Sequence, residues 1–354
     1  MVDNEAEAAG PVEQVIFLGA GASAADGAPL QGGIFRKYFT DLDMDDEWGN
    51  IVKTFFSEIF GISADVLDGS NPFPTFEEVL GLTEIAISQG ESIGKYSSTF
   101  NYDIQEPPML QNLHGILAFT IAQVLEMSLS SSSGEHHKAL VSNLIKKKLL
   151  TKTAFISLNY DILVDNAIGA SGQAVDYGID FTPNEKTGQI KLYKPHGSLN
   201  WLYCPRCRSI RLTHGEKGGA WIKRQPEKCQ CGQCRGMQES VIVPPTYFKV
   251  LSNLFLRQVW HAAEQALRGC KKIIFCGYSF PDADIYLRYL LKRAELANPH
   301  SPDIYIVNEH EKKEPSGKEE EEKRYRRFFR EKSKIHWIAL SFEQFCENPD
   351  AIGS

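Results

Sequence analysis

Short apolar runs alternate with segments of helical periodicity over much of the chain. The runs are Val15–Leu18, Ala154–Leu158, Lys272–Cys276 and Ile304–Val307, and each ends in a polar or glycine-containing turn. A continuous apolar run of this length is typical of a strand that is buried on both faces. Helical spacing appears around Phe255–Leu267 and Tyr286–Leu296. The alternation predicts an α/β fold with a Rossmann-like, doubly wound parallel sheet.

Between about residues 41 and 150 the strand pattern gives way to helical spacing. Helices are predicted at Glu47–Ile59, Thr75–Ser88, Met109–Leu129 and Glu135–Leu149, with Pro-, Ser- or Gly-containing breaks between them. We therefore expect a helical insertion over 41–150, inside a domain that spans 12–310. Residues 309–330 are dominated by Lys, Glu and Arg. Such a run predicts a solvated helix or loop, so we expect a charged C-terminal segment over 311–354.

Composition narrows the class of protein. The chain has 354 residues and 42% hydrophobic content, which is enough for a large core. A net charge of −7 provides no positive field for nucleic acid or anionic lipid, so direct nucleic-acid binding is not expected. No apolar run reaches the roughly 18 residues of a membrane helix, and the acidic start lacks the features of a secretion signal. We expect a cytoplasmic protein without a membrane partner.

Cysteine spacing predicts a zinc module. Two Cys-x-x-Cys pairs, Cys204/Cys207 and Cys231/Cys234, lie about two dozen residues apart, and five of the eight cysteines fall between 204 and 234. In a reducing compartment this pattern favours a metal over disulfides. Four thiolates fill a tetrahedral Zn²⁺ site and leave no open position, so the zinc ribbon over 200–240 is structural. Cys229 leaves an alternative, because Cys229/Cys231 can replace the second pair.

The first apolar run ends in the loop Gly19-Ala20-Gly21-Ala22-Ser23. Glycines at 19 and 21 allow backbone N–H groups to approach a pyrophosphate at a helix N-terminus. The third glycine of the usual dinucleotide pattern is replaced by Ala22 or Ala24. A tight strand-to-helix turn without a nucleotide therefore stays open as an alternative.

Two further motifs carry candidate chemistry. Asn159 and Asp161 follow an apolar run, at the strand end where open α/β sheets bind ligands. They suit a carboxamide and a ribose hydroxyl, and a helix cap is the alternative. His196 lies between Pro195 and Gly197, directly before the cysteine module. An imidazole titrates near neutral pH, so His196 is a candidate general base.

Taken in order, these segments resemble the NAD-binding core of the sirtuin superfamily. The matching residues are the glycine loop 19–23, Gly27-Ala-Pro29, Asn159-Tyr-Asp161, His196-Gly-Ser198 before the cysteine pairs, Gly277-Tyr-Ser279 and Asn308. The resemblance implies that Gly19, Ala20 and Gly21 hold the NAD phosphates, and that Ser23 and Pro29 also bind NAD. It implies that Gly277, Ser279 and Asn308 contact the adenosine half. It implies that Asn159 and Asp161 grip the nicotinamide ribose and carboxamide, with His196 as base. Asp282 and Asp284 fit either ribose contacts or a surface turn.

The chain departs from the protein deacylases of that superfamily. These carry Gly-x-Pro-Asp-Phe-Arg, where this chain has Gly27-Ala-Pro29-Leu30-Gln31-Gly32, and Gln where it has Leu158. The groups that shield the reacting ribose from water are thus replaced, and a hydrolase needs only a positioned water. The departures resemble those of bacterial sirtuin-like NAD hydrolases that act in abortive antiphage defence.

We therefore expect an NAD+ glycohydrolase that uses NAD+ as substrate, with Asn159, Asp161 and His196 as its catalytic residues. Two alternatives stay open: an NAD-dependent protein lysine deacylase and a non-catalytic NAD or ADP-ribose sensor. The resemblance also implies a homo-oligomer, with a partner ATPase or a phage-derived trigger as candidate regulators.

Overall fold

The computed structural model describes residues 11–42, 46–62, 72–91, 93, 107–179, 189–216, 225–243, 254–282, 284–299, 301–309 and 315–349. The chain forms two compact units. The first comprises Met1–Ala28, Ser131–Ser198 and Val250–Ser354, and the second comprises Pro29–Ser130 and Leu199–Lys249. The predicted insertion therefore has a counterpart in the second unit, which also contains the cysteine module.

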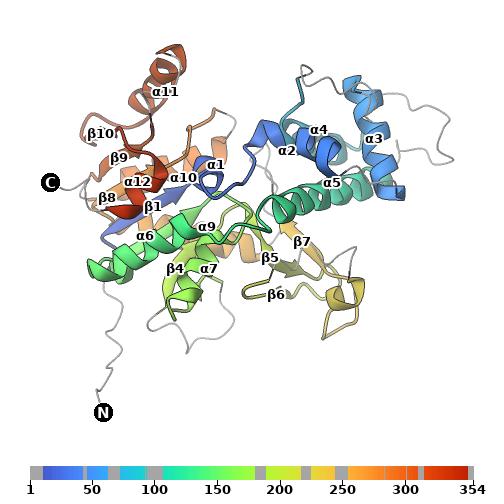
Figure 1. Ribbon diagram of the computed structural model, residues 1–354, viewed down its shortest axis with the longest axis horizontal. Helices are drawn as coiled ribbons and strands as arrows, with labels where there is room; N and C mark the ends of the chain where they lie inside the picture. Colours follow the sequence, from blue (N-terminus) through green and yellow to red (C-terminus); the bar gives the residue numbers. More distant parts are fainter. Residues whose placement is uncertain are drawn as a thin grey trace. The chain divides into compact units, whose positions relative to one another are not determined.

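The first unit is built on a seven-stranded parallel sheet in the order β10-β9-β8-β1-β2-β4-β3 (Figure 1). The strands are β1 (Gln14–Leu18), β2 (Thr153–Ser157), β3 (Val175–Asp176), β4 (Ile190–Tyr193), β8 (Lys272–Cys276), β9 (Asp303–Val307) and β10 (Ile335–Ile338). Strands β1 and β2 are buried along their whole length, as the apolar runs predict. The predicted parallel sheet is confirmed, and β3, β4 and β10 add to it.

The strand order creates one position for a ligand crevice. Strands β2, β4 and β3 lie in this order on one side of β1, whereas β8, β9 and β10, which come later in the chain, extend the sheet on the other. Open α/β sheets bind ligands outside the carboxyl ends of their strands, where the order reverses. The carboxyl ends of β1 and β8 mark that point in this sheet.

Helices of the first unit are α1 (Ala20–Ala24), α6 (Glu135–Lys146), α7 (Leu163–Ala170), α9 (Leu254–Gly269), α10 (Ile285–Ala297), α11 (Pro315–Phe328) and α12 (Phe342–Glu347). Helix α6 packs against α7 and α12, and α9 packs against α10. Helix α6 was predicted as part of the insertion, but its apolar face belongs to this unit.

The charged segment forms α11, and one side of this helix is anchored in the core. Tyr325 is fully buried, and its ring stacks on Phe280 at 4.7 Å between centroids. Its hydroxyl donates to the carbonyl of Tyr278 at 2.8 Å. The exposed side of α11 carries ion pairs such as Lys323–Glu319. The expected solvated helix is therefore amphipathic.

The second unit contains α2 (Ile34–Lys37), α3 (Glu47–Phe60), α4 (Phe76–Gln89) and α5 (Pro107–Ser128). Helix α5 packs against α2, α3, α4 and β7. Capping residues delimit two helices: Asp46 accepts from Gly49 N before α3, and Thr75 forms a capping box with Glu78 before α4. These helices confirm the predicted helical segments.

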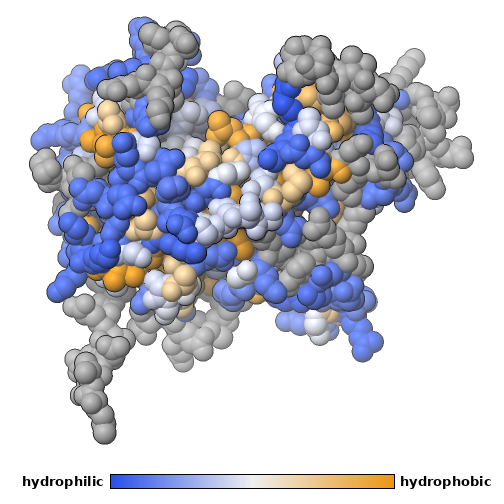
Figure 2. Space-filling view, viewed as in Figure 1, coloured by the Kyte–Doolittle hydropathy of each residue, from blue (hydrophilic) through white to orange (hydrophobic). Residues whose placement is uncertain are grey.

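A three-stranded sheet of order β6-β5-β7 completes the second unit, with β5 (Gly197–Tyr203), β6 (Ile210–Leu212) and β7 (Glu239–Ile242). None of the described helices of either unit combines the length and apolarity needed to cross a membrane. The face of the molecule in Figure 2 is largely hydrophilic, with scattered apolar residues.

Candidate functional site

Two glycine-containing loops meet at the point where the strand order reverses. Gly19 N donates to the carbonyl of Cys276, and Gly21 N donates to that of Gly277, both at 2.9 Å. A Cβ added at Gly19 would lie 2.5 Å from the Gly277 carbonyl oxygen, and one at Gly21 would lie 2.8 Å from Gly277 Cα. Glycine is thus required for the close approach of these backbones. The phosphate contacts of Gly19, Ala20 and Gly21 stay predictions, and α1 has only five residues.

A buried polar network joins the glycine loop to the Asn-Tyr-Asp motif. Asn159 Nδ2 donates to the Gly19 carbonyl at 2.8 Å and to Ser23 Oγ at 2.7 Å. Ser23 Oγ in turn donates to Asp161 Oδ2 at 2.6 Å. Because a carbonyl can only accept, the Gly19 contact determines which side of the Asn159 amide faces the loop. Asn159 is partly exposed, whereas Ser23 and Asp161 are buried.

Asp161 also contacts the start of α7. Its Oδ1 accepts from Leu163 N at 3.1 Å, which agrees with the helix-cap alternative for this residue. A carboxylate has further acceptor sites, so these bonds do not decide between a positioning role and a ligand contact. The direct contacts of Ser23 and Asp161 with NAD stay predictions.

Lys194 is fully buried and connects the Asn-Tyr-Asp motif with the turn that carries His196. Its Nζ donates to Ser198 Oγ at 2.6 Å and to the backbone carbonyl of Asp161. It also forms an ion pair with Asp165 Oδ2 at 3.3 Å, and Asp165 accepts from Tyr177 OH at 2.5 Å. A buried ammonium group needs such partners, because desolvation of an unpaired charge is costly. No pattern in the sequence indicates this position for Lys194, although it directly precedes Pro195-His196.

His196 faces a carboxylate. Its Nε2 lies 3.8 Å from Asp284 Oδ1, and both side chains are buried. Tyr278 OH donates to Asp284 Oδ2 at 3.1 Å, and burial together with Asp284 raises the pKa of Tyr278 well above its ordinary value, so the phenol stays protonated. The turn before β5 is held by Gly197, with φ of 87°, and by Trp260 Nε1, which donates to the Pro195 carbonyl at 3.0 Å.

The structure separates the two aspartates after β8. Asp282 is exposed and pairs with Arg288 at 2.8 Å and Arg327 at 2.5 Å, so the surface-turn interpretation describes it. Asp284 is buried beside His196. In the sequence the two aspartates are equivalent, because both occupy the same short polar segment.

The residues predicted for the adenosine half lie at the carboxyl ends of β8 and β9. Ser279 is exposed, and its carbonyl accepts from Arg324 Nε at 3.2 Å. Asn308 Nδ2 donates to both oxygens of the buried Glu321, at 3.0 and 3.2 Å. Pro29 is the first residue of the second unit. The ligand contacts of Gly277, Ser279, Asn308 and Pro29 stay predictions.

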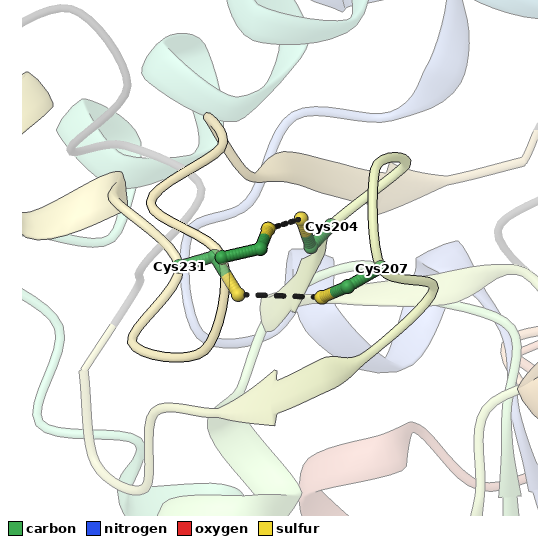
Figure 3. Close-up of side chains that lie close together, drawn as sticks. Cys204, Cys207 and Cys231 are labelled. Carbon is green, nitrogen blue, oxygen red and sulfur yellow. Dashed lines mark hydrogen bonds between the residues drawn. The ribbon is translucent and has the colours of Figure 1, made fainter.

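In the second unit four thiols form one cluster. The sulfur atoms of Cys204, Cys207, Cys231 and Cys234 all lie within 4.8 Å of one another. Sγ of Cys204 is 3.4 Å from that of Cys234, and Sγ of Cys207 is 3.5 Å from that of Cys231. Tetrahedral Zn²⁺ with bonds of about 2.3 Å requires sulfur separations of roughly 3.8 Å, so the cluster fits the ion. Figure 3 shows three of these side chains turned toward one point.

Both cysteine pairs have the same local geometry. Arg208 N donates to the carbonyl of Cys204 at 2.7 Å, and Arg235 N donates to that of Cys231 at 2.8 Å. Each arginine follows the second cysteine of its pair and has a left-handed φ, 59° and 58°. The repeated turn makes the two cysteine pairs equivalent, as in the knuckles of a zinc site.

Ser209 and Cys229 differ in their relation to the cluster. Ser209 Oγ lies 3.2 Å from Cys207 Sγ and 3.5 Å from Cys231 Sγ. Its hydrogen bond, together with backbone N–H groups of Cys234 and Gln233, lowers the pKa of Cys231 to about 6, which favours the thiolate that a metal needs. Burial instead raises the pKa of the Cys229 thiol, and Cys229 is outside the cluster. The alternative pairing of Cys229 with Cys231 is therefore excluded.

Comparisons with known proteins identify the family of the chain. A family described as SIR2-like domain matches residues 153–338, more than half of the chain. The chain therefore belongs to the SIR2-like family, which confirms the predicted sirtuin superfamily and implies the use of NAD+. A solved structure titled "The Structural basis for Sirtuin Substrate affinity" has 14% sequence identity to this chain and a TM-score of 0.41. The alignment covers 96% of this chain and 93% of the chain in that structure. No curated protein matches the chain.

Proposed function

We propose that the protein is an NAD+ glycohydrolase, which cleaves NAD+ to nicotinamide and ADP-ribose. The observation that carries the proposal is the link made by Lys194. Its ammonium group binds the Asp161 carbonyl and Ser198 Oγ, so the turn after β2 and the turn that carries His196 share one buried anchor. Candidate ribose-binding and base residues are thereby held next to each other at the ligand-binding edge of a parallel sheet.

Each residue then has a distinct role. Asn159, oriented by Gly19 and Ser23, positions the nicotinamide ribose or the attacking water. Asp161 holds the carboxamide, and its bonds to Ser23 and Leu163 fix its place before substrate binds. The water oxygen bonds to C1′ of the ribose while the C1′–N bond breaks, and its electron pair leaves with neutral nicotinamide. His196 accepts the proton that the water loses.

Leu158 favours hydrolysis over deacylation. It occupies the position before Asn159, where the deacylases have Gln, and its side chain is buried. An apolar side chain offers no hydrogen bond to an acyl-lysine substrate or to the reacting ribose. A deacylase must keep water away from that ribose, whereas a hydrolase uses the water.

Product analysis tests the proposal. Purified protein is incubated with NAD+, with and without an acetylated peptide, and the products are separated by chromatography. We expect ADP-ribose and nicotinamide without peptide. Acetylated ADP-ribose that appears only with peptide would identify a deacylase, and binding without turnover would identify a sensor.

Two variants test the residue roles. Asn159→Ala and His196→Ala should each lower turnover by about 10² or more, because each removes one preorganised polar or proton-transfer group. Binding of NAD+ should change less than turnover in both. Wild-type rates in both variants, measured on the assembled form that is active, would place the reaction elsewhere.

A role in antiphage defence and a homo-oligomeric state, with a partner ATPase or a phage-derived trigger, are part of the same proposal. They are supported by the resemblance in motif departures to the bacterial sirtuin-like hydrolases. Hydrolysis of cellular NAD+ without control would be toxic, which favours regulation by assembly or by a second protein.

A further inference from the structure

We propose that Glu321, on helix α11, determines specificity at the adenosine end of the substrate. It orients the amide of Asn308 so that this end favours the free 2′-hydroxyl of NAD+ over the 2′-phosphate of NADP+. This role rests on the proposed function, because the adenosine ribose of the substrate must lie against Asn308. Since Glu321 acts through Asn308, it is a positioning residue and not a catalytic one.

Helix α11 contacts both strand ends that are candidates for the adenosine half. At the end of β8, Arg324 Nε donates to the carbonyl of Ser279 at 3.2 Å. Directly after β9, Asn308 Nδ2 donates to both carboxylate oxygens of Glu321, at 3.0 and 3.2 Å. The charged segment, which the sequence places outside the NAD-binding core, therefore holds two of the residues that are predicted to bind adenosine.

Glu321 differs from its neighbours in the glutamate run 319–322. Its side chain is 1% exposed, whereas Glu319 and Glu320 are exposed. Burial of a carboxylate is costly unless donors compensate it, and the two hydrogen bonds from Asn308 provide part of that compensation. A charge that is removed from water and salt is weakly screened, so Glu321 acts on whatever binds next to Asn308.

The carboxylate also determines which side of the Asn308 amide is turned outward. An ionised carboxylate only accepts, so the NH₂ group faces Glu321 and the amide oxygen Oδ1 lies on the opposite side. Asn308 is half-buried, and Oδ1 is an acceptor suited to a ribose hydroxyl. A phosphate group brings acceptor oxygens and a charge of about −1.5 to −2. It would therefore meet an acceptor that is backed by a second negative charge.

Arg324 is the charge that opposes this selection, because a guanidinium group can bind phosphate. Its Nε is already bonded to the Ser279 carbonyl, and its NH1 group lies 3.9 Å from the carboxylate of Glu320. The side chain of Arg324 is 24% exposed, so water and salt screen its charge more than that of Glu321. The preference for a free hydroxyl should therefore dominate.

Calorimetric titration with ADP-ribose and with 2′-phospho-ADP-ribose tests this role without turnover. The wild type should bind ADP-ribose at least about tenfold more tightly, the scale of one lost hydrogen bond to a neutral group. Glu321→Gln keeps the shape but removes the charge, and its own NH₂ group allows the Asn308 amide to turn over. The ratio of the two affinities should fall by at least about fivefold in this variant.

The matched control is Glu319→Gln, which removes the same charge from the exposed side of α11, where Glu319 pairs with Lys323. Its affinity ratio should stay within about twofold of the wild type. If Glu321→Gln does not fold, Asn308→Ser serves, because it removes the oriented amide oxygen and keeps a donor. It should weaken ADP-ribose by about tenfold and the phosphorylated ligand by less than about threefold. Equal losses for the two ligands would overturn the proposal.

Turnover provides a second readout. The kcat/KM for NADP+ relative to NAD+ should rise in Glu321→Gln, whereas a merely structural role would lower both values alike. Equal affinity ratios in Glu321→Gln and Glu319→Gln, or a wild type that binds the phosphorylated ligand as tightly, would overturn the proposal and leave NAD+ hydrolysis standing. Protein that binds neither ligand would overturn it as well. The expected affinity ratios in protein that does not cleave NAD+ would refute the hydrolase function and leave the role of Glu321 intact.

Discussion

Replacing Lys194 by methionine should strongly destabilise the first unit. Methionine has a similar length but no charge, so the variant loses the ion pair with Asp165 and the bonds to Ser198 and the Asp161 carbonyl. Asp165 would then remain buried with Tyr177 as its donor and without its cation. The loss of compensation for a buried carboxylate, rather than the loss of packing, dominates the cost.

The expected size follows from that burial. Breaking a buried ion pair by removing one partner costs about 3–5 kcal/mol. The first unit has about 200 residues, and 1 kcal/mol shifts the Tm of a domain of that size by about 2–4 °C. The Tm of the first unit should therefore fall by roughly 6–20 °C. Lys191→Met, at a half-buried position of β4, is the control and should change Tm by no more than about 2 °C.

Calorimetry of the purified variants, with the double variant Lys194→Met/Asp165→Asn, completes the test. The double variant removes both charges and keeps an acceptor for Tyr177, so it should recover more than half of the lost Tm. Two results would refute the reasoning. One is a loss below about 3 °C for Lys194→Met, and the other is a double variant whose loss equals the sum of the single losses.

Two further predictions concern the second unit. Cys204→Ala should lose bound zinc, measured by metal analysis, and should also lose cooperative unfolding, because metal binding and folding are coupled. The control Cys229→Ala should keep both. A folded Cys204→Ala protein with a full equivalent of zinc would contradict the assignment. Burial lowers the pKa of His114 to about 4, below its value in the unfolded chain. The stability that the neutral imidazole provides is therefore complete above about pH 6.5 and is lost as the pH falls to about 4. The free energy of unfolding decreases by at most roughly 3 kcal/mol over that range. Urea unfolding at several pH values should show that His114→Gln loses less unfolding free energy on acidification than the wild type. Equal losses in the two proteins would argue against a neutral imidazole at this position.

Local patterns in the sequence were sufficient for the frame of the protein. The apolar runs at β1, β2, β8 and β9 predicted buried parallel strands, because a strand covered on both faces must be apolar at every position. The cysteine pairs predicted the four-thiol cluster, because cysteine spacing within each pair is local. Strand β10 was missed because it is half-buried along its length and lacks a continuous apolar run.

Only the tertiary structure decided which polar side chains act together. Ser23 and Asp161 are 138 positions apart and are joined by one hydrogen bond, which no periodicity encodes.

Asp282 and Asp284 look equivalent in the sequence, but the start of α10 turns one to the surface and the other toward His196. Lys194 looks like an ordinary surface residue until its carbonyl, hydroxyl and carboxylate partners are brought together around it. The sequence by itself determined the elements and the cysteines of the four-thiol cluster, because these depend on neighbouring positions. Packing decided the polar partners at the candidate site, because their contacts form only when distant strand ends meet at one edge of the sheet.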